Sequence, residues 1–384
     1  MGLLTFTSFA NQPQYETQSF ELNFFADQLK IDFAPDMKLP EPAELNNQVI
    51  DRMYRQLQAG PLDVLLASLL ALKAHYGLND YLFFKLAKNS LAAIYGGGSY
   101  QAREISLFAL LANAGFDVRL TFRTNQAYVN VFTQEELFEV PMIDHEGRAY
   151  ANLSCLNGEC AGRQSLFIYR LQPNPRGRSF GFQLKQWPTL AARPIKKNLE
   201  FQFRGLKLNI NLAYDLTTVE IMKDYPFINE YCYLDTPLSP TLAASLLPNL
   251  RTLLAPLSLR EQLELLVSFT RSAFEYKEDS EYFGRSKPMV PEELFSYAYS
   301  DCEDRAALFF ALVKELLQQP MTVLAYDDHL TVAVASNDIP GDHFTYQGRR
   351  YIFCDPTGPR NSSQIAEVPT GYAGKNFEII GQYE

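Results

Sequence analysis

Three residues in the C-terminal half of the chain could together carry out nucleophilic chemistry at a thiol. Cys302 stands in Ser300-Asp-Cys-Glu-Asp304, directly before an apolar helical pattern, His329 opens a β-branched run, and Asp355 follows a strand-like stretch. A thiol nucleophile, an imidazole base and a carboxylate that orients the imidazole are the three groups of a cysteine catalytic triad. The sequence therefore predicts a triad in the order Cys302, His329, Asp355.

The position of Cys302 favours a reactive thiol. Ser300 and Glu303 have the spacing of a capping box, which predicts that Cys302 lies in the first turn of a helix. Unpaired N–H groups and the positive helix end stabilise a thiolate, so we expect a pKa below the roughly 8.5 of a free cysteine. This expectation requires that Asp301, Glu303 and Asp304 point into solvent or cap the backbone. An inert buried cysteine is the alternative.

Each of the other two groups also has an alternative interpretation. His343, in a loop before the next strand, competes with His329 as the base, and Asp355 could be an ordinary turn aspartate before proline. Cys302, His329 and Cys354 could instead bind a metal, but they lack the close ligand pairs that zinc sites use. We therefore expect neither a metal nor a cofactor.

The motifs around these residues resemble those of a known family. Phe269-Thr-Arg-Ser-Ala-Phe-Glu-Tyr276, Ser300-Asp-Cys-Glu-Asp304, His329 and Cys354-Asp-Pro-Thr357 together look like bacterial transglutaminase-like domains, especially those in multi-domain proteins of Bacteroidetes. The resemblance covers about residues 255–360. It implies a papain-like α+β fold in which the cysteine opens a helix packed on an antiparallel sheet.

The resemblance also implies a role for each matched residue. Cys302 would be the nucleophile, His329 the base, Asp355 the orienting acid and Asp304 a structural helix residue. Related sequences carry Gln where this chain has Tyr282, so Tyr282 is a candidate for the oxyanion or substrate contact. The backbone N–H of Cys302 is the alternative oxyanion donor.

The chain also contains an internal duplication. Ser106-Leu-Phe108 matches Ala307-Leu-Phe309, and Gly147-Arg-Ala-Tyr150 matches Gly348-Arg-Arg-Tyr351, both at an offset of 201 residues. Upstream, the alternating runs of Phe20–Phe24 and Leu29–Phe33 match Leu199–Phe203 and Leu206–Ile210, with a tight turn expected at Arg204-Gly205. Helical stretches follow at 62–78 and 258–275, which we match to each other. The prediction is an α+β fold of two tandem papain-like, transglutaminase-like domains, each a helix bundle packed on an antiparallel sheet with an added β-hairpin.

We place the domain boundary near residue 190, between Pro188 and Pro194, which gives domains 1–190 and 191–384. At the offset of 201, the triad positions in the first copy are Gln101, Tyr128 and Ser154. None of these can replace the thiol, imidazole and carboxylate. The first domain is therefore expected to be a degenerate copy without catalysis, with a structural role or a role in binding partner proteins.

Composition excludes several function classes. The formal net charge is −10, without a Lys/Arg cluster, which argues against nucleic acid or an anionic membrane as partner. No apolar run has the length of a membrane span. Ser8-Phe9-Ala10 has the small-x-small pattern of a signal cleavage site, with a plain tail as the alternative. Cys155 and Cys160 could form a disulfide in an oxidising compartment, and we favour export, to the periplasm or cell surface, over the cytoplasm.

These observations predict a thiol-dependent amide hydrolase or acyltransferase that acts on a protein or peptide amide through a cysteinyl thioester. Hydrolysis and transamidation differ only in whether water or an amine accepts the acyl group. The alternative is a non-catalytic binding or scaffold protein that retains the transglutaminase-like fold.

Overall fold

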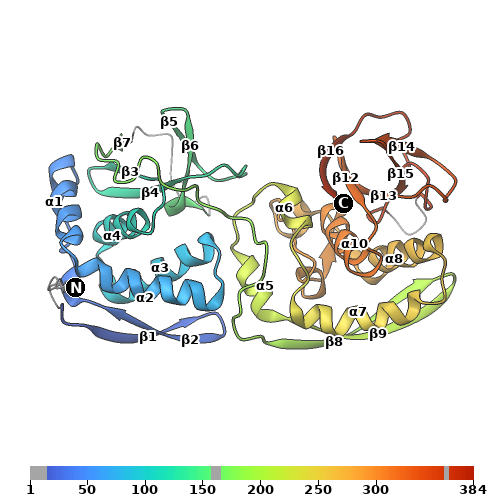
Figure 1. Ribbon diagram of the computed structural model, residues 1–384, viewed down its shortest axis with the longest axis horizontal. Coiled ribbons are helices and arrows are strands. Elements are labelled where there is room, and N and C mark those ends of the chain that lie inside the picture. The colour runs from blue at the N-terminus through green and yellow to red at the C-terminus, as the bar shows by residue number, and fades with distance from the viewer. Residues whose placement is uncertain (1–14, 157–165, 359–362) are drawn as a thin grey trace, which may run out of the picture. The chain divides into compact units, whose positions relative to one another are not determined.

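The computed structural model describes residues 15–156, 166–358 and 363–384 of the chain. It divides into two compact units (Figure 1). Unit 1 extends to residue 134 and continues over residues 139–182, and unit 2 comprises residues 135–138 and 183–384. The main boundary thus falls at 182/183 rather than near 190.

Unit 1 begins with a hairpin, continues with four helices and closes with a five-stranded sheet. Its elements are β1 (Gln18–Phe24), β2 (Asp27–Phe33), α1 (Asn47–Gln58), α2 (Pro61–Tyr76), α3 (Asp80–Tyr95), α4 (Tyr100–Asn113), β3 (Val118–Arg123), β4 (Gln126–Phe132), β5 (Met142–His145), β6 (Arg148–Asn152) and β7 (Phe167–Ile168), with short 3-10 turns at Pro35–Met37 and Leu153–Cys155.

Unit 2 repeats this plan with an additional segment before its last long helix. Its elements are β8 (Pro194–Phe203), β9 (Leu206–Asp215), α5 (Leu216–Lys223), α6 (Glu230–Leu234), α7 (Pro240–Leu254), α8 (Leu259–Ala273), β10 (Glu275–Tyr276), α9 (Asp279–Tyr282), the 3-10 turn Glu293–Phe295, β11 (Tyr299–Ser300), α10 (Cys302–Leu316), β12 (Met321–Tyr326), β13 (His329–Ala335), β14 (His343–Tyr346), β15 (Arg349–Cys354) and β16 (Glu378–Tyr383).

The two units share one topology. The large sheets have the orders β5-β6-β4-β3-β7 and β14-β15-β13-β12-β16, with antiparallel pairing throughout. In both units the hairpin covers one side of the helices and the sheet the other (Figure 1). Helices and antiparallel sheets, as the sequence predicted, thus make up both halves of the chain.

The structure corrects how the two helical blocks match. Asp80 and Leu259 open helices that pack in corresponding ways, α3 on β1 and α4, and α8 on β8 and α10. Both residues follow an N-cap, Asn79 or Ser258, and the offset is 179 residues. Hence α3 matches α8 and α2 matches α7, so pairing residues 62–78 with 258–275 was wrong. A helical hydrophobic period near 3.6 is common to both adjacent helices, so it cannot decide which helix of one unit corresponds to which helix of the other.

A segment before α10 accounts for the change in offset. Only residues 96–99 separate α3 from α4, whereas residues 274–301 separate α8 from α10. This longer connection carries β10, α9 and β11, and it ends at the residue that precedes Cys302. Unit 2 therefore places an insertion beside its thiol, and unit 1 has a glycine-rich turn in its place.

The β-hairpins that close each sheet end in turns with two residues of positive φ. Gln347 and Gly348 have φ of 49° and 76°, and Glu146 and Gly147 have φ of 53° and 74°. Such turns match the right-handed twist of the flanking strands and favour glycine at the second position. Arg204-Gly205, with φ of 50° and 79°, joins β8 to β9 in the same way and confirms the hairpin predicted there.

The core of unit 2 lies between α10 and its neighbours. The helix packs on α8 on one side and on β13 on the other. Its apolar residues from Ala306 to Val313 are buried together with Leu263, Leu266 and Phe269 of α8. Among the described helices, none alone has the length and hydropathy needed to cross a membrane.

Candidate functional site

Cys302 is the first residue of α10, as the sequence predicted, but the helix is capped by a different pair. Asp301 is the N-cap, and the reciprocal bonds of the capping box run between Asp301 and Asp304. The predicted box of Ser300 and Glu303 was therefore wrong by one position. Asp304 is fully buried, and its carboxylate accepts hydrogen bonds from the N–H groups of Asp301 (3.0 Å) and Met289 (2.8 Å).

The shift of the cap leaves the Glu303 carboxylate available to the thiol. Cys302 Sγ donates a hydrogen bond to Glu303 Oε2 at 2.9 Å. Burial, followed by the negative charge of Glu303, raises the pKa of Cys302 well above that of a free thiol. The expected lowering of this pKa is therefore contradicted, because Glu303 points at the sulfur instead of into solvent or at the backbone.

His329 and Asp355 lie together, as predicted. His329 Nε2 is 3.4 Å from Asp355 Oδ1 and 3.3 Å from Thr357 Oγ1. The Thr357 hydroxyl in turn donates to Asp355 Oδ1 at 2.7 Å. An Nε2–H placed between two acceptors leaves the other ring nitrogen, Nδ1, free to accept a proton from a nucleophile.

Asp355 is held by a network that keeps it ionised. It is 3% exposed, and Oδ1 also accepts a hydrogen bond from Thr331 Oγ1 at 3.2 Å. Arg271 Nη2 lies 3.6 Å from Oδ2 and also donates to the Asp355 carbonyl. Burial alone would raise the pKa of Asp355, but His329, Arg271 and Thr357 outweigh it and lower the pKa.

One backbone contact connects the thiol to the strand of His329, and an aromatic ring covers the imidazole. The backbone N–H of Leu330, the residue after His329, donates a hydrogen bond to Cys302 Sγ. The ring of Tyr372 stacks on the His329 imidazole, with centroids 4.8 Å apart and planes 21° apart. Burial, a hydrogen bond to Asp328 and the charges of Cys302 and Asp355 raise the pKa of Tyr372 to about 12. Tyr372 therefore packs on the imidazole and lies close enough to the thiol for the charge of Cys302 to affect its pKa.

The remaining predicted residues lie elsewhere. His343 begins the edge strand β14, is exposed, and approaches Gly341 O through Nδ1 at 3.0 Å, so it does not pair with Asp355. Tyr282 packs edge-on against Phe283 and Tyr299, with ring centroids 4.6 and 5.0 Å away, and not against the triad.

Tyr276 is a second tyrosine whose pKa is raised in part by the charge of Cys302. Burial comes first among the causes that raise its pKa, followed by its hydrogen bond to Glu278 and by the charge of Cys302. Its ring also lies 5.0 Å from the guanidinium carbon of Arg305. Tyr276 comes from the inserted segment before α10, so this segment helps to form the surroundings of the sulfur.

The triad positions of unit 1 carry other residue types, and the structure changes which residue corresponds to His329. The β3–β4 turn pairs Arg123 with Gln126, and the β12–β13 turn pairs Tyr326 with His329. Gln126, not Tyr128, is therefore the counterpart of His329. The offset between Gln126 and His329 is 203 residues. It returns to 201 after these strands, because the connection from β4 to β5 is longer than that from β13 to β14.

The other two triad positions in unit 1 also lack the reactive groups. Ser154 donates to Glu104 Oε2 at 2.5 Å, and Gln101 donates to Asn125 O at 2.5 Å. Amides and a hydroxyl replace the thiol, imidazole and carboxylate of unit 2.

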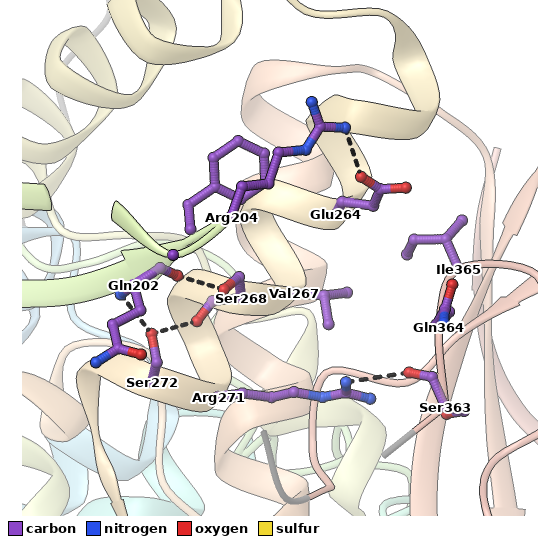
Figure 2. A pocket seen from close by; sticks show the side chains of 12 residues that line it. Gln202, Arg204, Glu264, Val267, Ser268, Arg271, Ser272, Ser363, Gln364 and Ile365 are labelled. Atoms are coloured by element: carbon purple, nitrogen blue, oxygen red, sulfur yellow. Dashed lines mark hydrogen bonds and ion pairs between the residues drawn. The ribbon is translucent and has the colours of Figure 1, made fainter. Parts of the chain in front are cut away.

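A cavity of 410 Å³ lies in unit 2 and adjoins the Asp355 network through Arg271. The β8–β9 turn, α8 and residues 363–365 line it, and Figure 2 shows Arg271 crossing it toward Ser363. Arg271 Nη1 donates to Ser363 O at 3.1 Å, while Nη2 approaches Asp355. Neither Cys302 nor His329 lines this cavity.

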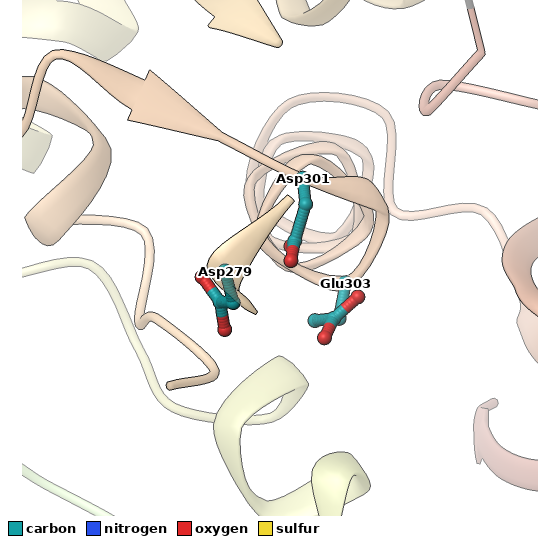
Figure 3. Close-up of side chains that lie close together, drawn as sticks. All are labelled: Asp279, Asp301 and Glu303. Atoms are coloured by element: carbon teal, nitrogen blue, oxygen red, sulfur yellow. The ribbon is translucent and has the colours of Figure 1, made fainter. Parts of the chain in front are cut away.

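Acidic side chains gather next to the thiol. Asp279, Asp301 and Glu303 each offer a carboxylate oxygen, and these oxygens lie within 4.8 Å of one another (Figure 3). Burial, with the charge of Glu303 as a further cause, raises the pKa of Asp279 to about 6. Burial and the neighbouring carboxylates Asp304 and Glu303 raise the pKa of Asp301 as well. The carboxylates therefore disfavour further negative charge nearby, including that of a Cys302 thiolate.

The other cysteines are poor nucleophiles or lie partly outside the described residues. Cys354 is fully buried, and burial raises its pKa. Burial also raises the pKa of Cys232 to about 11. Cys354 lies in the apolar core, so the alternative of a metal site with Cys302 and His329 finds no support in its position. Cys155 is buried and disulfide-bonded, and Cys160 lies outside the described residues.

Comparison with known proteins gives no further assignment. No protein-family model matches the chain, and neither a curated protein nor a solved structure matches it.

Proposed function

We propose that unit 2 is a transglutaminase-like cysteine hydrolase or acyltransferase with a papain-like arrangement, acting on an amide of a protein or peptide. The observation that carries this proposal is the pairing of His329 Nε2 with Asp355 Oδ1, 3.4 Å apart. His329 begins β13, which packs on the helix that starts at Cys302, and Asp355 directly follows β15 of the same sheet. The Leu330 N–H on the thiol sulfur supports it, since Leu330 directly follows the proposed base.

The proposed reaction follows from the arrangement of these groups. His329 Nδ1 accepts the proton of the Cys302 thiol, and the thiolate attacks the amide carbonyl carbon. The C–N bond breaks, the amine leaves with the proton from the imidazolium, and a thioester remains on Sγ. Water or an amine then attacks the thioester carbonyl and loses its proton to His329. The C–S bond breaks, the acyl group leaves on the new nucleophile, and the proton returns from the imidazolium to Cys302 Sγ.

The negative charge that develops on the carbonyl oxygen requires a donor. Cys302 opens α10, so its backbone N–H belongs to the first turn, where N–H groups lack partners within the helix. This donor is preferred over Tyr282, whose ring packs against Phe283 and Tyr299.

One observation favours the second candidate function, a scaffold that retains the fold without turnover. Glu303 accepts the thiol proton in a hydrogen bond and helps to raise the pKa of Cys302, which opposes nucleophilic attack. In the enzyme, substrate or another ligand must draw Glu303 away from the sulfur before reaction.

Amine release from a library of peptide amides distinguishes the two candidates. The enzyme releases amine from at least one member, and Cys302→Ala, His329→Ala and Asp355→Asn abolish release, whereas His343→Ala retains it. A library that yields no amine, while iodoacetamide still modifies Cys302, would favour the scaffold.

A further inference from the structure

Three acidic side chains converge beside the first turn of α10. Asp279 and Asp301 are 6% and 2% exposed, and Glu303 is half-buried. Their three ligand oxygens lie within 4.8 Å of one another. Figure 3 shows Asp301 directed between Asp279 and Glu303, so the three carboxylates converge from α9 and from the start of α10. Like charges at this distance, screened little by water, repel strongly.

Asp301 supplies an independent sign that a ligand belongs here. Its carboxylate accepts a hydrogen bond from the Asp304 N–H as the N-cap of α10. Its Oδ1 atom is buried and has no hydrogen-bond partner among the described residues. A buried carboxylate oxygen without a donor or cation is costly, so it points to a group that would satisfy it.

Three basic side chains of the adjoining segments, those of Lys277, Lys287 and Arg305, make contacts with other groups. The ammonium of Lys287 pairs with Glu293 at 2.5 Å, and only its backbone N–H donates to Asp279. The Lys277 ammonium lies over the ring of Tyr299, 5.2 Å from its centroid. The Arg305 guanidinium donates to Ser300 Oγ, Thr357 O and Phe274 O.

We propose that Asp279, Asp301 and Glu303 bind one hard divalent cation at the N-terminal end of α10. Carboxylate oxygens are the ligands that such cations prefer. Oxygens on opposite sides of Ca²⁺ lie about 4.6–5.2 Å apart, whereas Mg²⁺ draws them to about 4.2 Å. Three oxygens within 4.8 Å of one another lie within about 2.8 Å of a common centre, which is close to the Ca–O distance, whereas Mg²⁺ requires the site to contract further.

The site would join the two parts of unit 2 that surround the thiol. Asp279 lies in the inserted segment between α8 and α10, whereas Asp301 and Glu303 flank Cys302. A cation bound by Glu303 would also attract the carboxylate that otherwise accepts the hydrogen bond from Sγ. Cation binding requires neither the thiol nor turnover, so this inference stands or falls separately from the proposed function.

Titration calorimetry on the full chain, stripped with EDTA and titrated separately with CaCl₂, MgCl₂ and MnCl₂, tests the site. We expect saturable binding of one ion per chain. Asp279→Asn and Glu303→Gln should each weaken it by about tenfold or more. Glu281→Gln is the matched control, because it removes one charge from an exposed position of α9, and it should leave binding unchanged.

Thermal unfolding gives a second readout, because the two substitutions should affect the melting temperature in opposite directions without and with the ion. In EDTA, Asp279→Asn and Glu303→Gln relieve repulsion and should melt at or above the wild-type temperature, whereas the saturating ion should stabilise the wild type more than either variant. The proposal is overturned if the wild type binds none of the three ions at millimolar concentration. The proposal is also overturned if Glu303→Gln binds the ion as tightly as the wild type, or if Glu281→Gln loses as much affinity as Glu303→Gln, since the ion would then lie elsewhere. Asp301→Asn is not needed for this decision, because Asp301 also caps α10.

Discussion

Cys302 Sγ donates a hydrogen bond to Oε2 of Glu303, its neighbour in the chain, at 2.9 Å. The capping box of α10 uses Asp301 and Asp304, so Glu303 is not needed by the backbone. The carboxylate instead stabilises the neutral thiol over the thiolate. In this state Glu303, beside the proposed triad, opposes ionisation of the nucleophile.

Glu303→Gln should lower the pKa of Cys302, because it removes a negative charge from a buried sulfur. The wild-type thiol should ionise above the roughly 8.5 of a free cysteine, and the variant at lower pH than the wild type. Both thiol pKa values can be measured from the rate of iodoacetamide alkylation as a function of pH in EDTA. Mass spectrometry identifies the labelled peptide. Glu281→Gln is the control. Identical profiles for wild type and Glu303→Gln would show that the hydrogen bond does not govern the thiol.

Asp355→Asn should reduce amide turnover by about four orders of magnitude, because an amide cannot stabilise the imidazolium of His329. Thr357→Val, which removes the hydroxyl that contacts both His329 and Asp355, should cause a smaller loss. His343→Ala should retain activity close to the wild type. Steady-state rates at one substrate concentration compare the three. Loss in His343→Ala together with full activity in Asp355→Asn would reverse the assignment of the base and its partner.

Arg271→Met should destabilise unit 2 by about 3 kcal/mol, because it leaves the buried carboxylate of Asp355 without its cationic partner. Arg204→Met is the matched control: Arg204 also contacts two carboxylates, Glu261 and Glu264, but at an exposed position, and the effect should be much smaller. Urea unfolding of both variants provides the comparison. Equal destabilisation would mean that burial of the Arg271 contact contributes nothing.

Glu292 should make the protein less stable as the pH rises. It is 1% exposed, and burial raises its pKa to about 7 from an ordinary value of 4.5. The folded form binds this proton more tightly, so stability is greatest below about pH 4.5 and falls until about pH 7, by about 3 kcal/mol at most. Glu292→Gln keeps an acceptor for Asp215 N and Ser239 Oγ and should remove that part of the slope.

Unfolding free energies of the wild type and Glu292→Gln at pH 5 and pH 8 check this prediction. The variant should gain stability relative to the wild type at pH 8 and lose that advantage at pH 5. Glu281→Gln, at an exposed position, should leave the slope unchanged. A constant difference between wild type and Glu292→Gln at both pH values would show that Glu292 does not titrate in this range.

The sequence predicted the triad partners because each lies at the edge of a regular element. Alternation placed His329 at the start of a strand and Asp355 at the end of another, and antiparallel pairing of β13 with β15 brings them together. The capping residues of α10 could not be predicted in the same way. Ser300-Asp-Cys-Glu-Asp304 contains two overlapping capping boxes, and the choice between them decides whether Glu303 faces the backbone or the thiol.

Other contacts could not be read from local patterns. Arg271 reaches Asp355 across more than eighty positions of the chain, and Tyr372 stacks on His329 from a loop without periodicity. Arg271 lies within the motif that ends at Tyr276, but spacing alone assigns it no partner. Only the turn registers showed that Gln126, not Tyr128, corresponds to His329.

The central claim is that Cys302 forms a covalent acyl intermediate with His329 as its base. The most direct test is intact-mass measurement on protein quenched in acid during incubation with the peptide-amide library, followed by peptide mapping. The account predicts an acyl mass on Cys302 in the wild type and its loss in His329→Ala. An acyl group on Cys232 or Cys354, or one that forms on Cys302 equally fast in His329→Ala, would contradict it.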